Sequence, residues 1–352
     1  MSKTVFVGLS GGVDSSVSAA LLKEQGYRVV GVYMKNWSRD VPGYPCPWRS
    51  DYQDAKRVAV QLGIDFELFD FEQAYEERVV GYMLEQYQLG LTPNPDIMCN
   101  QEIKFKLFYD AARERGADFI ATGHYAKAVD GKLYTAKDSN KDQTYFLYRV
   151  NSEALQHTLF PLADLTKPEV RVLAAKYNLV TATKKESMGI CFVGKIGIKE
   201  FLSQYVHTEP GPIVDEGGRV VVEHDGALFY TIGQRHGLNV GGGLPYYVAG
   251  KDMAKNEVYV TTDIADERLW ADSFELSACH WITEPPQPGD SLLVRTRHRG
   301  SLVPVSSIEL SDGGRAKLMV AESVKALAPG QSAVLYRGDE CLGGGIISSS
   351  NL

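Results

Sequence analysis

The chain lacks several features that would assign it to a large class of proteins. It has no apolar run of roughly eighteen residues, the length that a membrane-spanning helix needs. Its first ten residues begin directly with a strand-like run and show no cleavable signal pattern. Its five cysteines are scattered and include no Cys-x-x-Cys pair, which argues against a disulfide framework and against a zinc site. We therefore expect a cytoplasmic protein with reduced thiols, no membrane contact and no permanent metal.

A surplus of positive charge is also missing. The chain has 37 Lys and Arg against 44 Asp and Glu, which gives a net charge of −7. This argues mildly against a polyanionic partner, although nucleic-acid binding needs only a local basic surface. The composition, 44% hydrophobic and 23% charged, is that of an ordinary globular protein, and 352 residues predict two or three domains.

The first two hundred residues alternate short apolar runs with amphipathic stretches. We expect strands at 4–9, 29–34, 66–71 and 118–122, and helices at 14–25, 51–62 and 106–115. This alternation predicts an α/β domain built on a parallel sheet that is covered on both faces. Ligands of such sheets bind beyond the carboxyl ends of the strands.

The pattern changes near Val206, where Gly and Pro become frequent and short alternating runs replace the helices. We predict three domains: an α/β domain over 1–205, a small β-rich central domain over 206–271 and a β-barrel over 272–352. The barrel strands are expected at 291–297, 302–310, 315–320, 332–336 and 341–347.

A candidate phosphate-binding loop follows the first strand and opens a helix. Its sequence is Ser10-Gly11-Gly12-Val13-Asp14-Ser15-Ser16. Two adjacent glycines let the backbone approach phosphate oxygens, and the helix N-terminus adds unpaired N–H donors. There is no Gly-Lys-Ser/Thr ending, so this is not a Walker loop. The alternative is a capped strand-to-helix turn without a ligand.

From Gly8 to Ser16 the loop resembles that of the PP-loop ATP pyrophosphatase superfamily, whose enzymes adenylate a substrate oxygen and release pyrophosphate. The resemblance implies that the 1–205 domain binds ATP through Gly8, Leu9, Ser10, Gly11, Gly12, Val13, Asp14, Ser15, Met34 and Gly123. Met34 would lie against the adenine, or else fill the core. Asp14 would help to place Mg²⁺, or else compensate the helix dipole.

Two cysteines occur in motifs that could carry chemistry. Cys99 ends Asn94-Pro95-Asp96-Ile97-Met98-Cys99 just ahead of an amphipathic stretch, a position that can lower a thiol pKa. Cys191 lies in the Gly-rich segment 189–194. Each cysteine taken singly has the alternative of being a buried small residue, and the sequence does not show that they meet.

Taken together, the motifs resemble the tRNA-specific 2-thiouridylase family over essentially the full length. The segments that carry the resemblance are 8–15, Asn94-Pro95-Asp96 with Cys99-Asn100, 121–125, 141–143 with 145–147, 189–192, 231–235, 329–331 and 343–345. The family implies ATP-dependent 2-thiolation of the wobble uridine of tRNA, by adenylation of O2 and sulfur transfer from a cysteine persulfide. The rivals are another PP-loop enzyme, such as an amidating ligase, and a non-catalytic RNA-binding or sulfur-carrier protein.

The resemblance also implies roles for individual residues. Cys191 would hold the persulfide, Cys99 would be its catalytic partner in a transient disulfide, and Asp96 would be a general acid or base. The residues that would contact tRNA are Asn94, Pro95, Asp96, His124, Lys141, Asp142, Gln143, Arg297, His298, Arg299 and Gln331. A persulfide donor, such as a cysteine desulfurase or a sulfur relay protein, is implied as a second partner.

Two further segments stand out in composition. Arg295, Arg297 and Arg299 would share one face of a strand and form a basic row, or else a solvated strand edge. The segment 43–50 departs from the more acidic, serine-rich stretch usual in the family, and we take its Cys46 as non-catalytic.

Overall fold

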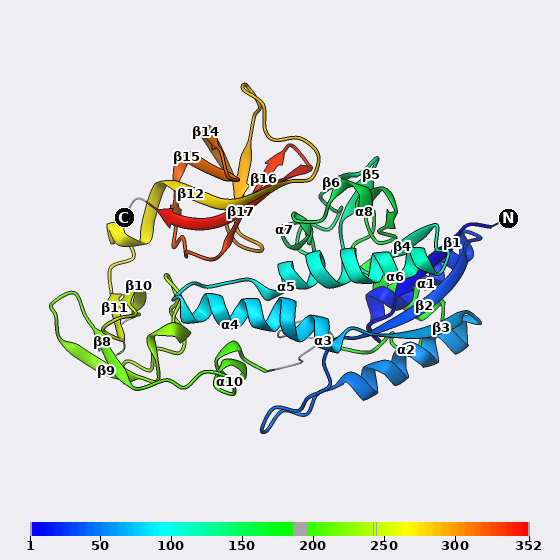
Figure 1. Cartoon of the computed structure of the whole chain (residues 1–352), viewed down its shortest axis with the longest axis horizontal. Helices are drawn as coiled ribbons and strands as arrows, with labels where there is room; N and C mark the ends of the chain where they lie inside the picture. The colour runs from blue at the N-terminus through cyan, green and yellow to red at the C-terminus, as the bar shows by residue number, and fades with distance from the viewer. Residues whose placement is uncertain (1, 186–195, 242, 244, 351–352) are drawn as a thin grey trace.

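The computed structural model describes residues 2–185, 196–241, 243 and 245–350. The described residues form three β-sheets, and the two termini lie at opposite ends of the molecule (Figure 1). Cys191 falls outside the described residues, and so does the Gly-rich segment around it.

The first sheet is parallel throughout, as the alternating pattern predicts, with the strand order β3-β2-β1-β4-β7. Its strands are β1 (Thr4–Gly8), β2 (Arg28–Lys35), β3 (Asp65–Asp70), β4 (Phe119–Ala121) and β7 (Thr158–Leu159). The central strands are apolar on both faces. Val5 and Val7 pack with the helices on one side, whereas Phe6 joins the cluster around Phe105 and Phe108 on the other. A sheet buried on both faces places its ligand site at the strand ends.

Helical segments surround this sheet and connect its strands. They are α1 (Val13–Glu24), α2 (Trp48–Leu62), α3 (Glu72–Tyr75), η1 (Glu76–Val80), α4 (Gly81–Gln88), α5 (Pro95–Met98), η2 (Cys99–Leu107), α6 (Phe108–Glu114), α7 (Thr144–Leu147), α8 (Ser152–Gln156), α9 (Lys167–Lys176) and α10 (Ile198–Leu202). Segments α5, η2 and α6 follow without a break, and Figure 1 shows them as one long helix beside α4. The middle part, η2, is π-helical.

The expected start of this long helix, residue 106, is wrong. The helix begins at Pro95, because Asn94 caps it: its side chain accepts a hydrogen bond from the backbone N–H of Asp96, and proline suits the first helical position. Cys99 therefore lies inside the helix rather than just ahead of it. The Asn-Pro pair is a helix-start signal that the sequence already contains.

The C-terminal strands close into a barrel of six. They are β12 (Trp270–Trp281), β13 (Leu293–Arg295), β14 (Val303–Ser311), β15 (Arg315–Lys325), β16 (Ser332–Arg337) and β17 (Glu340–Ser350). The order β12-β15-β14-β13-β16-β17 closes through pairing of β17 with β12. Five of these strands match expected ones, and β12 is additional.

A hairpin from the α/β region extends the barrel sheet. Strands β5 (Lys127–Val129) and β6 (Lys132–Tyr134) pair with each other, and β6 also pairs with β17 through Leu133 and Cys341. One apolar cluster runs from the parallel sheet into the barrel and includes both Tyr145 and Tyr336. The first domain and the barrel therefore share a hydrophobic core at this point.

The middle sheet is smaller and lies apart from the parallel sheet (Figure 1). Its strands are β8 (Gly211–Val214), β9 (Val220–His224), β10 (Tyr247–Asp252) and β11 (Glu257–Thr261), in the order β10-β11-β8-β9. Two short 3-10 turns, η3 (Ala227–Phe229) and η4 (Glu267–Leu269), flank it. The predicted domain limits at 205/206 and 271/272 stay predictions.

Candidate active site

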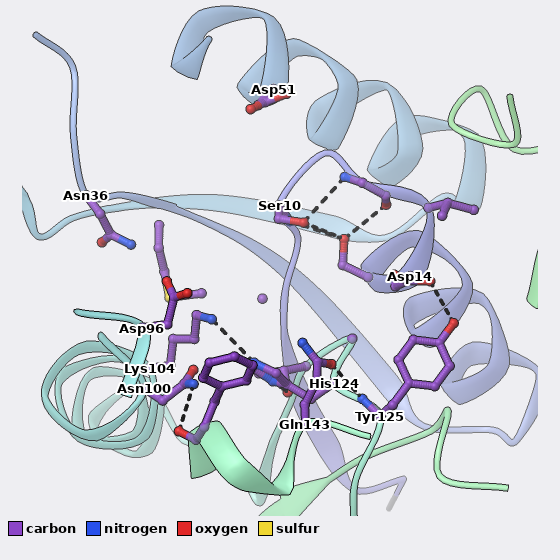
Figure 2. A pocket seen from close by; sticks show the side chains of 18 of the residues that line it. Ser10, Asp14, Asn36, Asp51, Asp96, Asn100, Lys104, His124, Tyr125 and Gln143 are labelled. Carbon is purple, nitrogen blue, oxygen red and sulfur yellow. Dashed lines mark hydrogen bonds between the residues drawn. The ribbon is translucent and has the colours of Figure 1, made fainter. Parts of the chain in front are cut away.

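A cavity of about 450 Å³ opens at the carboxyl ends of β1, β2 and β4. Its walls come from the phosphate loop, the end of β2, the long helix from Pro95 onward, the segment after β4 and the barrel residues His298 and Arg299. Figure 2 shows Asn36, Asp96 and Asn100 on one side of this cavity, with Asp14 and Tyr125 on the other. Parallel-sheet enzymes bind their ligands at this position.

The phosphate loop keeps an open helix N-terminus. Gly12 is the N-cap of α1 and no side chain caps it, so the first N–H groups of the helix remain available to an anion. The hydroxyls of Ser10 and Ser15 lie 3.2 Å apart, and Ser16 donates to the carbonyl of Gly12 at 2.7 Å. Serine contacts within the loop thus hold its shape.

Glycine is required at two places around this loop. Gly11 has φ +74°, and a Cβ there would come within 2.4 Å of the carbonyl oxygen of Asp51. A Cβ at Gly123 would come within 2.7 Å of the backbone nitrogen of Ser15. Any side chain at either position would push α2 or the β4 segment away from the loop.

The structure gives Asp14 a partner that the sequence did not reveal. Both of its carboxylate oxygens accept from Nζ of Lys167 at 2.7 Å, and Oδ1 also accepts from the hydroxyl of Tyr125 at 3.0 Å. Its carboxylate is therefore paired with Lys167, and its expected role in placing Mg²⁺ stays a prediction. Lys167 and Tyr125 both line the cavity. Nothing in the sequence around Lys167 marks it as a site residue.

The end of β2 forms the cavity wall opposite the loop. Met34 is 7% exposed and lines the cavity. Its methyl group lies 2.8 Å from the position that a Cβ on Gly8 would take, so glycine leaves room for it. Leu9 faces the hydrophobic core instead.

The long helix contributes Asp96, Asn100 and Lys104 to the cavity. These residues are four apart, so they lie along one helix face. Cys99 does not line the cavity: it is fully buried and packs in the cluster that contains Trp37 and Phe201. Among the residues described, no cysteine is in a disulfide.

His124 is held in the neutral form. Burial, and secondarily the ammonium group of Lys104, lowers the pKa of its imidazole well below the usual value. Nδ1 lies 2.7 Å from the hydroxyl of Thr122, and Nε2 lies 3.4 Å from Nζ of Lys104. His124 lines the cavity, as its expected role requires, but it is deeply placed.

The side chains of the segment 141–143 lie in two places, at the cavity and against the barrel. Lys141 and Gln143 line the cavity, and Oε1 of Gln143 accepts from the backbone of Tyr125 at 2.9 Å. Asp142 is 3% exposed and forms an ion pair with Arg295 at 3.2 Å. Burial raises the pKa of the Asp142 carboxyl. Its side chain therefore joins two parts of the fold, and its contact with tRNA stays a prediction.

The expected basic row on one strand face is wrong. Strand β13 ends at Arg295, which is buried against Asp142, and Arg299 has φ +60° in the turn that follows. Arg297 donates to the carbonyls of Lys325 and Ala326, and Arg299 donates to that of Asn140 at 3.1 Å. The backbone N–H of Gly300 donates to the carbonyl of Arg297 at 2.9 Å, which closes the turn. The expected contact of Arg297, His298 and Arg299 with tRNA does not depend on a strand face, and it stays a prediction.

This turn places an aromatic pair at the cavity. The rings of His298 and Phe146 lie 4.5 Å apart, and both residues line the cavity. Burial, followed by the nearby charges of Arg299 and Arg295, lowers the pKa of His298 to about 4. The imidazole is neutral at pH 7 and suits stacking rather than phosphate binding.

Gln331 lies outside the cavity wall. Its side chain donates to the carbonyl of Thr92 at 2.8 Å, which ties the barrel to the loop that precedes Asn94. Thr92 also contacts the middle domain, since its hydroxyl lies 3.2 Å from that of Thr231. Cys46 is half-buried and packs beside the cluster that contains Cys99.

Two wider properties of the chain concern membranes and metal ions. Within the described ranges, no helix is both long enough and apolar enough to cross a membrane. Over those same residues, no group of three or more His, Cys, Asp or Glu side chains is arranged to hold a metal ion.

Three family models match the chain in sequence order. Residues 3–195 match the tRNA methyl transferase HUP domain, 199–262 the tRNA methyl transferase PRC-barrel domain, and 271–347 the aminomethyltransferase beta-barrel domain. The first of these models spans more than half of the chain.

Curated relatives are similar along their whole length. A protein of Enterococcus faecalis named tRNA-specific 2-thiouridylase MnmA is 46% identical over 98% of this chain and 96% of its own. The protein of that name from Cupriavidus metallidurans is 48% identical over 98% and 99%. Among solved structures, a 4-thiouridine synthetase in complex with RNA and ATP covers 57% of this chain and 50% of its own, with a TM-score of 0.38 and 18% identity, too weak a likeness to carry an argument.

Proposed function

Because the chain belongs to the tRNA-specific 2-thiouridylase family, we propose that it replaces O2 of the wobble uridine of tRNA by sulfur and consumes ATP in doing so. The observation that carries the proposal is one shared cavity. The open phosphate loop and the helix that bears Asp96 line the same 450 Å³ space. A nucleotide and a single base can therefore meet there. A methyl transferase, the class named in the matched models, has no use for a pyrophosphate-binding loop.

The first half-reaction is adenylation of the base. O2 of uracil attacks the α-phosphorus of ATP, the bond to the β-phosphate oxygen breaks, and pyrophosphate leaves on the phosphate loop. The uracil ring loses its N3 proton as O2 becomes bonded to phosphorus. Asp96, one of the cavity-lining residues of the long helix, would be the general acid or base that takes up that proton. The product carries AMP as a good leaving group in place of a carbonyl oxygen.

The second half-reaction is sulfur transfer. A persulfide on Cys191 attacks C2 and expels AMP, and the thiolate of Cys99 then breaks the S–S bond and forms a disulfide with Cys191. Alternatively, Cys99 first releases hydrosulfide from the persulfide, and the hydrosulfide attacks C2. Both routes end with the Cys99–Cys191 disulfide, so a reductant and a fresh persulfide must follow. Because Cys99 is fully buried, either route keeps its thiol away from bulk water.

The nucleotide would be held by the phosphate loop, with Met34 against the adenine and Gly123 beside it. Mg²⁺ would neutralise charge on the departing pyrophosphate, and its ligands would be mainly phosphate oxygens, because Asp14 already pairs with Lys167. The residues His124, Lys141, Gln143, His298 and Arg299 would surround the anticodon loop where it enters. We place the protein in the cytoplasm, with tRNA and a persulfide donor as its partners.

The decisive experiment is nucleoside mass spectrometry of tRNA after incubation with the protein, ATP and a sulfide source. We expect 2-thiouridine at the wobble position, with one AMP and one pyrophosphate released per base. A 2-methylthio or methylated base, or an amidated small molecule with unmodified tRNA, would contradict the proposal. Release of no pyrophosphate would leave a non-catalytic RNA-binding protein or sulfur carrier.

A further inference from the structure

Asn36 is a buried amide whose polar atoms are unpaired among the described residues. Its side chain is 1% exposed, and neither Oδ1 nor Nδ2 has a hydrogen-bond partner within the part of the chain that the structure describes. A buried amide without partners is costly, because both its donor and its acceptor have lost water. Asn36 lines the cavity, and Figure 2 shows its amide turned toward the side that Asp96 and Asn100 occupy.

The neighbours of Asn36 hold it in this position. Lys35 forms an ion pair with Glu72 at 2.7 Å. The indole N–H of Trp37 donates to the carbonyl of Arg39 at 2.9 Å, and the ring packs on Phe201. Because both adjacent residues are anchored, the backbone that carries the amide is fixed beside the cavity. The amide is held ready for a ligand inside the cavity.

A second amide faces the same cavity with a fixed orientation. Asn100 is 3% exposed, and its Nδ2 donates to the carbonyl of Phe146 at 3.1 Å. That bond leaves Oδ1 as the free end, and Oδ1 has no partner among the described residues. Asn100 therefore offers an acceptor that cannot be exchanged for a donor. The amide of Asn36, by contrast, has no partner that fixes its orientation.

We propose that these two amides bind the target pyrimidine by the edge that O2 does not occupy: Asn36 binds the group at position 4, and Asn100 accepts the N3–H. The inference rests on the proposed function. In uracil, O4 is an acceptor and N3–H is the only ring donor, so Nδ2 of Asn36 donates to O4 and Oδ1 of Asn100 accepts from N3. O2 is then left to face the nucleotide. Asn100 accepts the N3–H of the bound uracil before the reaction, and the proton passes to Asp96 only as O2 is adenylated.

The same arrangement explains a preference for uracil over cytosine. Cytosine has an amino group at position 4 and a lone pair at N3. Asn36 can reverse its amide and accept from the amino group, so it binds both bases. Asn100 cannot reverse, and its oxygen would face the lone pair of N3. Asn36 thus positions either pyrimidine base in the cavity, and Asn100 selects uracil over cytosine.

The test uses the full-length protein with α,β-methylene-ATP and three anticodon stem-loops that differ only in the target base. The bases are uracil, cytosine and pyrimidin-2-one, which lacks the group at position 4. In the wild type, we expect cytosine to bind roughly tenfold or more weakly than uracil, and pyrimidin-2-one to bind more weakly still. Asn36→Leu should abolish the difference between cytosine and pyrimidin-2-one. Asn100→Leu should abolish the difference between uracil and cytosine.

Stability provides an independent readout for Asn36. Because Asn36→Leu removes an unsatisfied amide at similar volume, the melting temperature of the free protein should be unchanged or higher. Thr181→Val is the matched control: Thr181 is 1% exposed, its hydroxyl has no partner among the described residues, and it does not line the cavity. This control should also melt at an unchanged or higher temperature, with unaltered stem-loop binding.

Several outcomes would overturn the inference. A lower melting temperature for Asn36→Leu would mean that the amide has a structural partner. Weaker binding of α,β-methylene-ATP without RNA would assign Asn36 to the nucleotide. An unchanged order of the three bases in both variants would mean that the amides do not read the base. Failure of the proposed function is separate, because the wild type would then form no 2-thiouridine at all.

Discussion

Arg295 of the barrel and Asp142 of the first domain form a nearly buried ion pair, with Nη1 3.2 Å from Oδ1 and side chains that are 13% and 2% exposed. Asp142 also accepts from the hydroxyl of Thr144 and from the backbone N–H of Ala136. The pair lies where the apolar core of the parallel sheet continues into the barrel. It joins the segment 141–143, of which Lys141 and Gln143 line the cavity, to the end of the strand that precedes the turn with His298.

Removing one member of this pair should destabilise the protein. We expect Arg295→Met to cost about 3 kcal/mol at neutral pH, because it leaves the Asp142 carboxylate buried without its cation. Burial already raises the pKa of Asp142, and the substitution should raise it further. A raised carboxyl pKa favours the folded state only while the group is protonated. The loss should therefore shrink as the pH falls from 7 toward the range where Asp142 takes up its proton.

The measurement is the melting temperature of the wild type and the variant at several pH values between 5 and 8. Arg28→Met is the matched control, because Arg28 pairs with Asp65 at the surface, with side chains that are 66% and 68% exposed. Its effect should be small at every pH. A cost for Arg295→Met that stays the same across the pH range would show that the guanidinium packs rather than neutralises Asp142.

The second prediction concerns the phosphate loop. Gly11→Ala should abolish pyrophosphate release, since its methyl group would meet the backbone oxygen of Asp51 at 2.4 Å and displace the loop. Gly26→Ala is the control, because Gly26 also has a positive φ, +87°, but open space around it. Both variants carry a backbone strain of about 1 kcal/mol, and only Gly11→Ala should lose activity. Equal loss in both would mean that strain, not the close approach, is responsible.

Stem-loop affinity distinguishes a local change from a global one. We propose that the loop binds only the nucleotide, and the barrel turn comes from a distant part of the chain, so Gly11→Ala should bind the anticodon stem-loop as the wild type does. A filter-binding assay without ATP measures this. Affinity that fell together with pyrophosphate release would contradict the separation of the two binding regions.

The sequence predicts local features of this molecule well, and the site only in part. The strand of Val5 to Val7 and the glycines after it form a pattern of neighbours in the chain, so the parallel sheet and the strand-to-helix turn are confirmed, whereas phosphate binding stays a prediction. Pairing of Leu133 with Cys341 joins residues about two hundred positions apart, and no local pattern signals it. The sequence does not identify Lys167 and Asn36 as site residues for the same reason. Each becomes a site residue only because distant segments surround it in the fold.

The turn after β13 shows a different reason why a prediction from sequence is wrong. Alternation of Arg295, Arg297 and Arg299 is a valid strand pattern, but strand identity depends on pairing that the residues themselves do not determine. Strand β13 pairs with its neighbours only as far as Arg295, and the left-handed backbone of Arg299 then turns the chain toward Asn140. The last residue of the strand, Arg295, forms the ion pair with Asp142, a long-range contact that no local pattern signals.

The third prediction concerns the two cysteines of the proposed mechanism. Cys191→Ser should form no 2-thiouridine but should still release pyrophosphate in the first turnover, since adenylation precedes sulfur transfer. Cys99→Ser should be inactive with a persulfide donor. Slow residual thiolation by Cys99→Ser with excess free sulfide would indicate attack by hydrosulfide. Mass spectrometry of the tRNA and a pyrophosphate assay, run on the same samples, measure both half-reactions.

Cys279→Ser provides the matched control for these variants. Cys279 is half-buried in the barrel, and burial raises the pKa of its thiol to about 11, so it is almost entirely protonated at pH 7. Its replacement should leave both half-reactions unchanged. Thiolation that survived in Cys191→Ser would remove Cys191 from the mechanism.

The last prediction concerns RNA binding by the barrel. The turn after β13 is the candidate binding surface. Arg295 is buried and takes no part, which leaves Arg297 and Arg299, whose guanidinium groups bind backbone carbonyls rather than carboxylates and so keep their full charge. Replacing both by Ala should weaken stem-loop binding and reduce its salt dependence. The slope of log affinity against log salt concentration should fall by about one unit for each phosphate that is no longer neutralised.

ATP-analogue binding should not change, and Arg315→Ala, at an exposed hairpin position, serves as the control. Titrations at several salt concentrations give the slope directly. If the double variant keeps the wild-type slope, the two guanidinium groups serve only to hold the turn, and the barrel binds phosphates with another of its faces.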